Sequence, residues 1–177
     1  YAFSLSAEGL LNAQLVLGQE LSQVELTGAK RQSQADKAYS LTLAYVARRM
    51  RSEGELHDYF RRKQYAPELY EQIMWRLRQL DFVNDAEFAR RWVENRRFLK
   101  ATSTKKLRLE LKQKKISNEL IESVLSSDET DERQILRELV EKKRKQSRYT
   151  DPRKLMMYLA RQGFSYDDIK AVLNETD

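Results

Sequence analysis

The chain has no cysteine, a single histidine, five glycines and two prolines among its 177 residues. Without cysteine it can form neither disulfides nor thiolate metal sites, and one histidine excludes a histidine cluster around a catalytic metal. So few turn residues argue against an all-β fold, whose hairpins need glycine, asparagine and aspartate. No run of about 18 apolar residues is present, so no membrane-spanning helix is expected. Long helices joined by short links are predicted instead.

The glycines give no support for a nucleotide-dependent enzyme, because all five are isolated and form no phosphate-binding loop. No arrangement of serine, histidine and aspartate typical of a hydrolase is visible. His57 is expected to lie solvated within a helix amid charged residues. Asp167 and Asp168 are adjacent at an expected helix start, where the helix dipole favours carboxylates. We therefore expect a protein that is not an enzyme and that uses no cofactor and no metal.

The N-terminus shows neither the basic-then-apolar pattern of a secretion signal nor an initiating methionine. We expect the chain to begin within a longer gene product. A cytoplasmic location is expected, since a reducing compartment fits the absence of cysteine.

Charge is abundant and unevenly placed. Charged residues make up 34% of the chain, against roughly 25% in ordinary domains, and the net charge is +6. Residues 1–37 carry a net charge of −1, residues 38–127 one of +7, and residues 128–177 none. A basic middle segment favours a polyanionic partner. The alternative, that the cations only coat solvated helix faces, stays open.

The first residues have a different pattern from the rest. Tyr1, Phe3 and Leu5 alternate with small or polar residues, which predicts a short strand. Ser22 and Glu25 form a capping box that begins a helix. We expect residues 1–37 to form a small N-terminal α/β segment, truncated at its start.

From residue 38 onward the sequence repeats. Residues 106–125 and 154–173 align without a gap at a period of 48, so that Leu107 matches Leu155 and Leu111 matches Leu159. Residues 55–77 form an earlier copy, offset by 51 and, after a three-residue insertion, by 48. Each copy has two amphipathic segments and follows one further helical segment; these lie near 38–50, 85–97 and 129–145.

The fold class predicted from these repeats is mainly α, with three tandem three-helix repeats after the N-terminal α/β segment. The expected boundaries are 38–82, 83–127 and 128–177. Because each repeat buries part of its apolar surface on its neighbours, an elongated, curved array is expected.

One helix of the second repeat carries the strongest candidate interface. At 100° per residue, Lys105, Arg108, Lys112 and Lys115 fall within a sector of about 80°, away from the packing residues. Four aligned cations suit a phosphate backbone or an acidic protein surface. The other cations that are candidates for binding DNA or an acidic protein are Arg48, Arg49, Arg61, Arg62, Lys63, Arg90, Arg91, Arg97, Lys100, Lys106, Lys142, Lys143, Arg144 and Lys145.

Several aromatic residues could in principle stack on nucleobases. Helical spacing instead favours a place in the core, as the i, i+4 pair Phe88 and Trp92 indicates. The same expectation covers Trp75, Phe82 and Phe98.

Three segments resemble the RecX family, which modulates the RecA recombinase. RSEGELHDYFRRK at 51–63 is similar to the first-repeat motif of that family, and DFVNDAEFARRWVENR at 81–96 to the motif that opens its second repeat. YAFSLSAEGLLNAQLVLGQELS at 1–22 is similar to the end of the N-terminal strand region of longer members. Two departures stand where the family often has glycine, Ala101-Thr102 and Lys115, and they put the local turn geometry in doubt.

The resemblance implies a regulator of RecA in recombination, DNA repair and the SOS response. Such a protein binds the RecA filament on single-stranded DNA, inserts along its groove, and inhibits its ATPase, strand-exchange and coprotease activities. The implied partners are RecA and single-stranded DNA, with double-stranded DNA as a further candidate; a monomer without membrane association is expected. Two alternatives stay open: a sequence-independent DNA-binding module acting without RecA, and a helical adaptor for an acidic protein.

Overall fold

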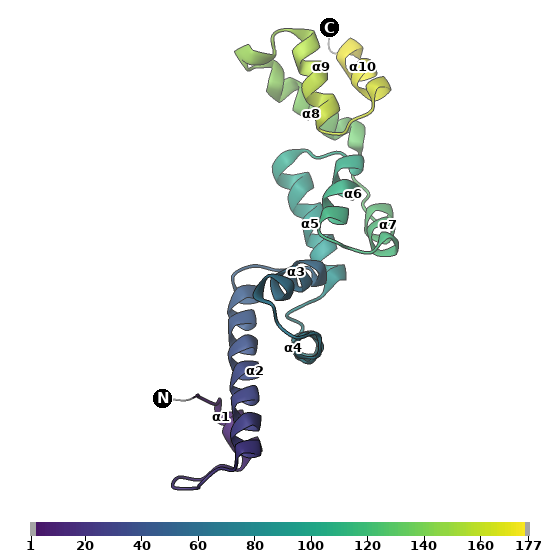
Figure 1. Ribbon diagram of the computed structural model, residues 1–177. Coiled ribbons are helices and arrows are strands. Elements are labelled where there is room, and N and C mark those ends of the chain that lie inside the picture. Colours follow the sequence, from purple (N-terminus) through teal and green to yellow (C-terminus); the bar gives the residue numbers. More distant parts are fainter. Residues whose placement is uncertain (1–2, 176–177) are drawn as a thin grey trace. The chain divides into compact units, whose positions relative to one another are not determined.

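The computed structural model describes residues 3–175, within which the chain forms ten α-helices, one 3₁₀ helix and no strand (Figure 1). The elements are α1 (Ala7–Ala13), α2 (Gln23–Ala47), α3 (Glu53–Lys63), α4 (Pro67–Gln79), α5 (Asp85–Lys100), α6 (Thr104–Gln113), α7 (Asn118–Ser126), α8 (Glu132–Arg144), η1 (Ser147–Tyr149), α9 (Pro152–Arg161) and α10 (Tyr166–Glu175). The mainly helical fold and the three three-helix repeats are confirmed.

The predicted N-terminal strand is wrong for the residues that the structure describes. Residues 3–5 have no regular structure, and Tyr1 lies outside the described residues. Helix α1 follows instead, with the Gly9 amide donating to Oγ of the N-cap Ser6 over 2.9 Å. A period of two over six residues is too short to specify a strand that has no partner strand to pair with.

Helix α2 is longer than expected. The predicted capping box is present, since the side chains of Ser22 and Glu25 each accept from the other's amide. The helix then continues to Ala47, through the expected boundary at residues 37 and 38. Strong helix formers occupy most of its positions and no proline interrupts it, so the change in charge at that point does not end it.

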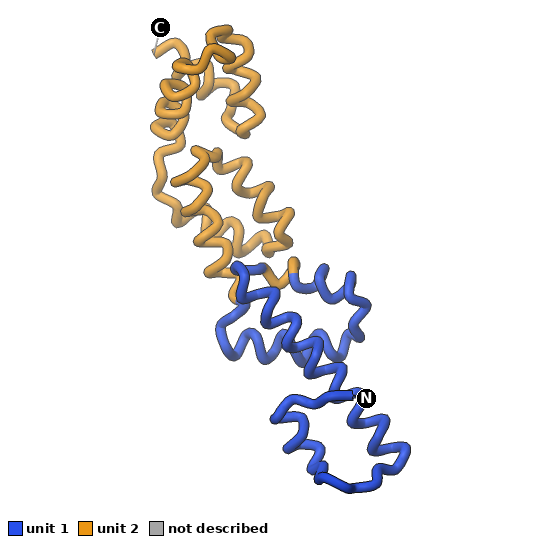
Figure 2. Tube along the Cα trace, turned by 90° about the vertical axis from the view of Figure 1, so that its left-hand side faces the viewer, with its two compact units in different colours: residues 1–51, 56–83 blue, residues 52–55, 84–177 orange. Residues whose placement is uncertain are grey.

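Two compact units make up the chain (Figure 2). Unit 1 comprises residues 1–51 and 56–83, and its core lies among α2, α3 and α4. Within it the ring of Tyr45 on α2 stacks on that of Tyr59 on α3, with centroids 4.4 Å apart. Leu56, Met74 and Leu77 are fully buried there.

Unit 2 comprises residues 52–55 and 84–177 and holds two three-helix bundles, α5–α7 and α8–α10. The residues that the repeat alignment pairs are buried in both: Leu107 with Leu155, and Leu111 with Leu159. Burying one aliphatic side chain of this size contributes about 1.5–3 kcal/mol, so these matched positions account for much of each small core.

The middle helix of every repeat ends in a left-handed turn at the same aligned position. Gln64, Lys115 and Gly163 have φ values of 56°, 61° and 94°. Lys115 thus adopts the conformation that glycine provides in the third repeat, and Ala101 does the same at the end of α5 with φ 47°. Both departures from the family pattern therefore keep the turn and accept backbone strain, since this region is unfavourable for residues with a Cβ.

Two hydrogen bonds of the same kind lie within unit 2. The buried hydroxyl of Ser103, the N-cap of α6, donates to the carbonyl oxygen of Gln162, the C-cap of α9, over 2.7 Å. The buried hydroxyl of Ser52 donates in the same way to the carbonyl oxygen of Lys114 over 2.7 Å. Gly163 must lack a side chain here, because a Cβ would lie 2.3 Å from the Ser103 Oγ.

Candidate nucleic-acid interface

The arginines on the outer face of α5 are paired with carboxylates. Arg90 Nη2 lies 2.8 Å from Oε1 of Glu87, and Arg90 also pairs with Glu94. Arg91 Nε lies 2.5 Å from Glu87 Oε1. Hydrogen bonds from Arg90 and then Arg91 lower the pKa of Glu87 to about 2, so this carboxylate is ionised at neutral pH. The two arginines therefore add little net charge to the surface.

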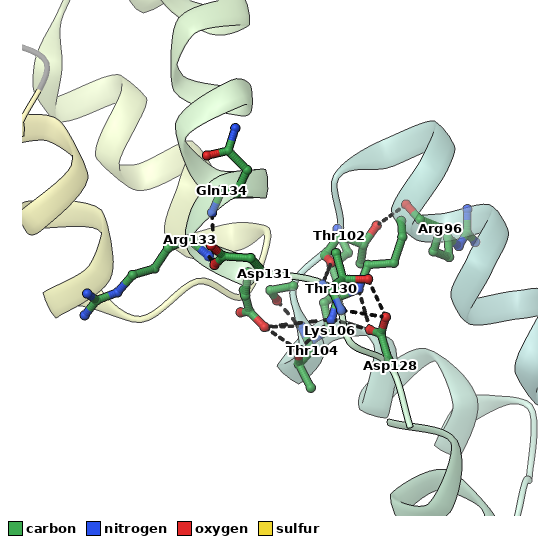
Figure 3. A network of polar contacts seen from close by, with 12 residues as sticks. Arg96, Thr102, Thr104, Lys106, Asp128, Thr130, Asp131, Arg133 and Gln134 are labelled. Carbon is green, nitrogen blue, oxygen red and sulfur yellow. Dashed lines mark hydrogen bonds and ion pairs between the residues drawn. The ribbon is translucent and has the colours of Figure 1, made fainter. Parts of the chain in front are cut away.

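Arg97 is not a surface cation, which corrects its place among the candidate binding residues. Its side chain is 9% exposed and lies 2.8 Å from the Asp128 carboxylate. It also donates to the carbonyl oxygen of Thr102 over 2.6 Å and to Thr104 Oγ1 over 2.8 Å. Figure 3 shows Thr102, Thr104 and Asp128 converging where the two bundles of unit 2 meet. Arg97 thus joins α5 to the segment that leads into α8.

Trp92 and its neighbours form a second paired group. The Trp92 indole N–H donates to Glu110 over 2.9 Å, and Arg96 Nε to the same carboxylate oxygen over 2.6 Å. The Arg96 guanidinium lies 4.5 Å from the centre of the Trp92 ring. Lys114 Nζ lies 5.0 Å from that ring and 2.8 Å from Glu55. The two cations of this cluster are therefore paired with carboxylates, Arg96 with Glu110 and Lys114 with Glu55.

The core prediction for the aromatic residues holds in part. Phe88 is buried and Trp92 is half-buried, with stacked rings whose centroids are 5.7 Å apart. For Trp75, Phe82 and Phe98 the prediction is wrong, because they are 62%, 45% and 88% exposed. Trp75 lies within α4 and Phe98 near the end of α5, in both cases on the side of the helix that faces solvent, and Phe82 lies in the link between α4 and α5.

The four aligned cations of the second repeat are not equivalent. Helix α6 ends at Gln113, so Lys115 lies beyond it in the left-handed turn. Arg108 makes a bidentate pair with Glu122 of α7, with both distances 2.8 Å. The hydrogen bond from Arg108 lowers the pKa of Glu122. Lys105 and Lys112 remain exposed on the outer face of α6.

The neighbouring candidate Lys106 has a structural partner. Its Nζ donates to Oε1 of Gln162 over 2.7 Å, across the junction between α6 and α9. It therefore belongs to the contact between bundles more than to the outer face.

The cations at the end of α8 surround a shallow cleft of about 370 Å³. Lys100, Lys142 and the exposed Phe98 and Leu99 line it. Lys143 Nζ lies 4.8 Å from the centre of the Tyr158 ring, beneath the same cleft. Of the remaining two candidates, Arg144 lies 3.5 Å from the carbonyl oxygen of Leu173, and Lys145 is exposed.

The first-repeat candidates form a group of their own in unit 1. Arg61 pairs with Asp58 over 3.1 Å, and Arg49 donates to the carbonyl oxygen of Met50 over 2.9 Å. Lys63 Nζ lies 5.9 Å from the Tyr59 ring centre. The last two members, Arg48 and Arg62, are exposed, and so is His57 on α3.

The exposed face of α9 carries cations that are not among the candidates predicted from the sequence. Arg153, Met157 and Arg161 lie on it, one turn apart. The 48-residue alignment places Arg153 opposite Lys105 of α6, and this is the signal that could have identified the face.

Within residues 3–175, no three histidine, aspartate or glutamate side chains converge closely enough to bind a metal. In the same residues, each helix is too short or too polar to traverse a bilayer.

Comparisons with known proteins match every repeat. The family models described as the first, second and third three-helix domains of RecX match residues 38–77, 84–125 and 130–173. The Regulatory protein RecX of Bacillus licheniformis is 30% identical, and that of Bacillus subtilis (strain 168) 29% identical, each alignment covering 100% of this chain and 69% of the relative.

Solved structures show the same fold. A crystal structure of regulatory protein RecX superposes with a TM-score of 0.75 at 23% identity, covering 98% of this chain and 90% of that one. A crystal structure of RecX from Lactobacillus salivarius gives a TM-score of 0.66 at 26% identity, covering 80% of this chain and 95% of that one.

Proposed function

The chain belongs to the RecX family of regulatory proteins, and from this premise we propose that it binds the RecA filament on single-stranded DNA and inhibits its ATPase, strand-exchange and coprotease activities. It does so as a cytoplasmic protein that contributes binding surface and carries out no chemistry of its own. Its partners are RecA and the DNA within the filament.

The match of all three domains, in order, carries this proposal. A tandem array offers several weak contacts to a repeating filament, and linked weak contacts gain avidity. The exposed Lys105 and Lys112 on α6 add an attraction for an anionic polymer. A regulator that binds one filament state more tightly than another shifts the equilibrium towards that state.

The test is a titration of RecA ATP hydrolysis on single-stranded DNA. We expect hydrolysis to fall as this protein is added, in proportion to the filament it occupies. Hydrolysis that stays unchanged at saturating protein would contradict inhibition, and faster hydrolysis would show stimulation instead.

A DNA-binding module acting without RecA is the second candidate, favoured by the unpaired cations of α6. The two candidates differ in how inhibition depends on DNA. When DNA is in large excess, there is too little of this protein to cover the free DNA. Under that condition, only a protein that recognises the filament itself still inhibits RecA ATP hydrolysis. Inhibition that appears only once free DNA is coated would support the second candidate.

A further inference from the structure

Helix α6 presents an apolar residue between two cations on its exposed face. Lys105, Leu109 and Lys112 fall within about 60° of one another, opposite the buried Leu107 and Leu111. Leu109 is 54% exposed and lies between the two lysines.

Helix α9 repeats this arrangement one repeat later. Arg153, Met157 and Arg161 fall within about 80°, and Met157 is 56% exposed. At the period of 48, Arg153 aligns with Lys105 and Met157 with Leu109. The second cation is shifted by one residue, because Lys112 aligns with Ala160 and Arg161 with Gln113. An exposed face of cation, apolar residue and cation on two successive middle helices nevertheless indicates a shared ligand.

Several arginines of unit 2 form ion pairs that these cations lack. The pKa of Glu122 on α7 is lowered chiefly by Arg108 and to a smaller extent by the charge of Lys112. Arg133 pairs with Asp168 over 3.1 Å, and Arg137 pairs over 3.0 Å with the last residue of α10. Among the described residues, neither Lys105 nor Arg153 makes any ion pair, and the same holds for Lys112 and Arg161. Exposed cations without an ion pair therefore lie on both middle helices of unit 2, as they do at Lys100, Lys145 and Arg148 among the other described residues of that unit.

The start of one motif and the end of the other lie near a hydrogen bond inside unit 2. The Ser103–Gln162 hydrogen bond of 2.7 Å and the close approach at Gly163 join the start of α6 to the end of α9. Lys105 and Arg161 each lie within two residues of that hydrogen bond. One motif therefore begins near the place where the other ends.

The spacing favours a polynucleotide over a folded protein partner. Each helix has ten residues and is about 15 Å long. Carboxylates on the surface of a folded protein follow no fixed repeat, whereas the cations here recur along two successive helices. A nucleic acid instead repeats its charge every few ångströms.

We propose that the exposed faces of α6 and α9 form a two-part track for single-stranded DNA. Lys105, Lys112, Arg153 and Arg161 contact phosphates, and Leu109 and Met157 lie against unstacked bases, which only a single strand exposes. The track excludes the first repeat, where Gly54 and Asp58 occupy the positions of Lys105 and Leu109. This inference rests on the proposed function, which places the protein on DNA-bound filaments, and it identifies the residues that touch the strand.

The test measures binding of a fluorescently labelled oligothymidylate to the full chain, without RecA, by anisotropy at several salt concentrations. Two variants remove the motifs separately, K105Q/K112Q and R153Q/R161Q. The plot of log affinity against log salt has a negative slope, to which each phosphate contact on a single strand contributes about 0.7. Each variant removes two contacts, so we expect its slope to be shallower than that of the wild type by about 1.4. The loss of affinity between 50 and 200 mM salt then becomes about sevenfold smaller than in the wild type.

Matched controls separate the track from net charge. K30Q/K170Q removes two exposed lysines outside the track and should keep the wild-type slope. R153K/R161K keeps the charges and should keep the slope as well. Thermal unfolding followed by circular dichroism should show wild-type stability for every variant, because all the changed side chains are exposed.

If R153Q/R161Q kept the wild-type slope of log affinity against log salt, the proposed track would be wrong. It would also be wrong if the wild-type chain failed to bind the oligonucleotide at low salt. The ATPase titration decides the proposed function separately. Inhibition of RecA that survives in a variant unable to bind DNA would leave the regulatory function standing and would show that it does not use this track.

Discussion

Glu87 gives the clearest dependence on pH. Its pKa is held at about 2 by Arg90 and Arg91, below the ordinary value of 4.5. A carboxyl whose pKa is lower in the folded state contributes stability above its unfolded pKa and loses it as the pH falls. We expect Glu87→Gln to be less stable than the wild type at pH 7, with the difference vanishing between about pH 4.5 and pH 2. Urea midpoints across that range would show this, with the exposed Glu141→Gln as control; a difference that persists at pH 2 would contradict it.

The left-handed turns predict opposite effects of glycine at aligned positions. Gln64 is exposed with φ 56°, so Gln64→Gly should stabilise the chain by about 0.5–1 kcal/mol, as relief of strain outweighs the entropy of glycine. Gly163→Ala should destabilise it by at least about 2 kcal/mol, because strain adds to a clash of the Cβ with Ser103 Oγ. Denaturant unfolding measures both, and a destabilised Gln64→Gly would show that the turn is not strained.

The sequence could not predict which cations lack a carboxylate partner and are available to bind a ligand. Periodicity tells which face of a helix a side chain occupies, and it placed Arg108 correctly on the outer face of α6. It does not tell what other elements bring to that face: Glu122 comes from α7, and Asp128, which neutralises Arg97, from the segment before α8. Partners three or four residues away on one helix could have been predicted from spacing, as for Arg90 and Arg91 on α5 and Arg61 on α3.

The junctions between middle helices depend on single hydroxyl groups. Ser103 Oγ accepts from the Lys106 amide over 3.2 Å and donates to the Gln162 carbonyl, whereas exposed Ser117 caps α7 through the Leu120 amide alone. We expect Ser103→Ala to cost about 2 kcal/mol, the sum of a lost cap and a lost buried hydrogen bond, and Ser117→Ala about 1 kcal/mol. Equal losses in denaturant unfolding would indicate that the bond between bundles adds nothing.

Helices were predictable where two signals coincided. The period of 48 and the caps Asp151-Pro152 and Ser165 located α9 and α10, and the caps are present in the structure. The predicted end of α2 was wrong. Ser22 and Glu25 mark the start of that helix, but no turn residue marks its end, and the change in composition near residue 37 does not interrupt it. Turn residues end helices through backbone geometry, and a change in charge does not.

The molecule has two compact units whose cores are separate. That separation predicts that a substitution which destabilises one unit has a smaller effect on the stability of the other. Arg97 provides the means to test this, because its ion pair with Asp128 lies wholly within unit 2 and both side chains are nearly buried, at 9% and 11% exposed. Removing one member of a buried pair leaves the other charge without compensation.

We expect Arg97→Ala to destabilise unit 2 by roughly 3 kcal/mol. Amide hydrogen exchange should then accelerate at Leu107 and Leu136 in unit 2, while protection at Phe60 and Met74 in the core of unit 1 stays near that of the wild type. Arg91→Ala is the matched control, since an exposed pair contributes at most about 1 kcal/mol. Equal loss of protection in both cores would mean that the chain unfolds as one cooperative body, and that binding energy gained on the α6–α9 track would stabilise unit 1 as strongly as unit 2.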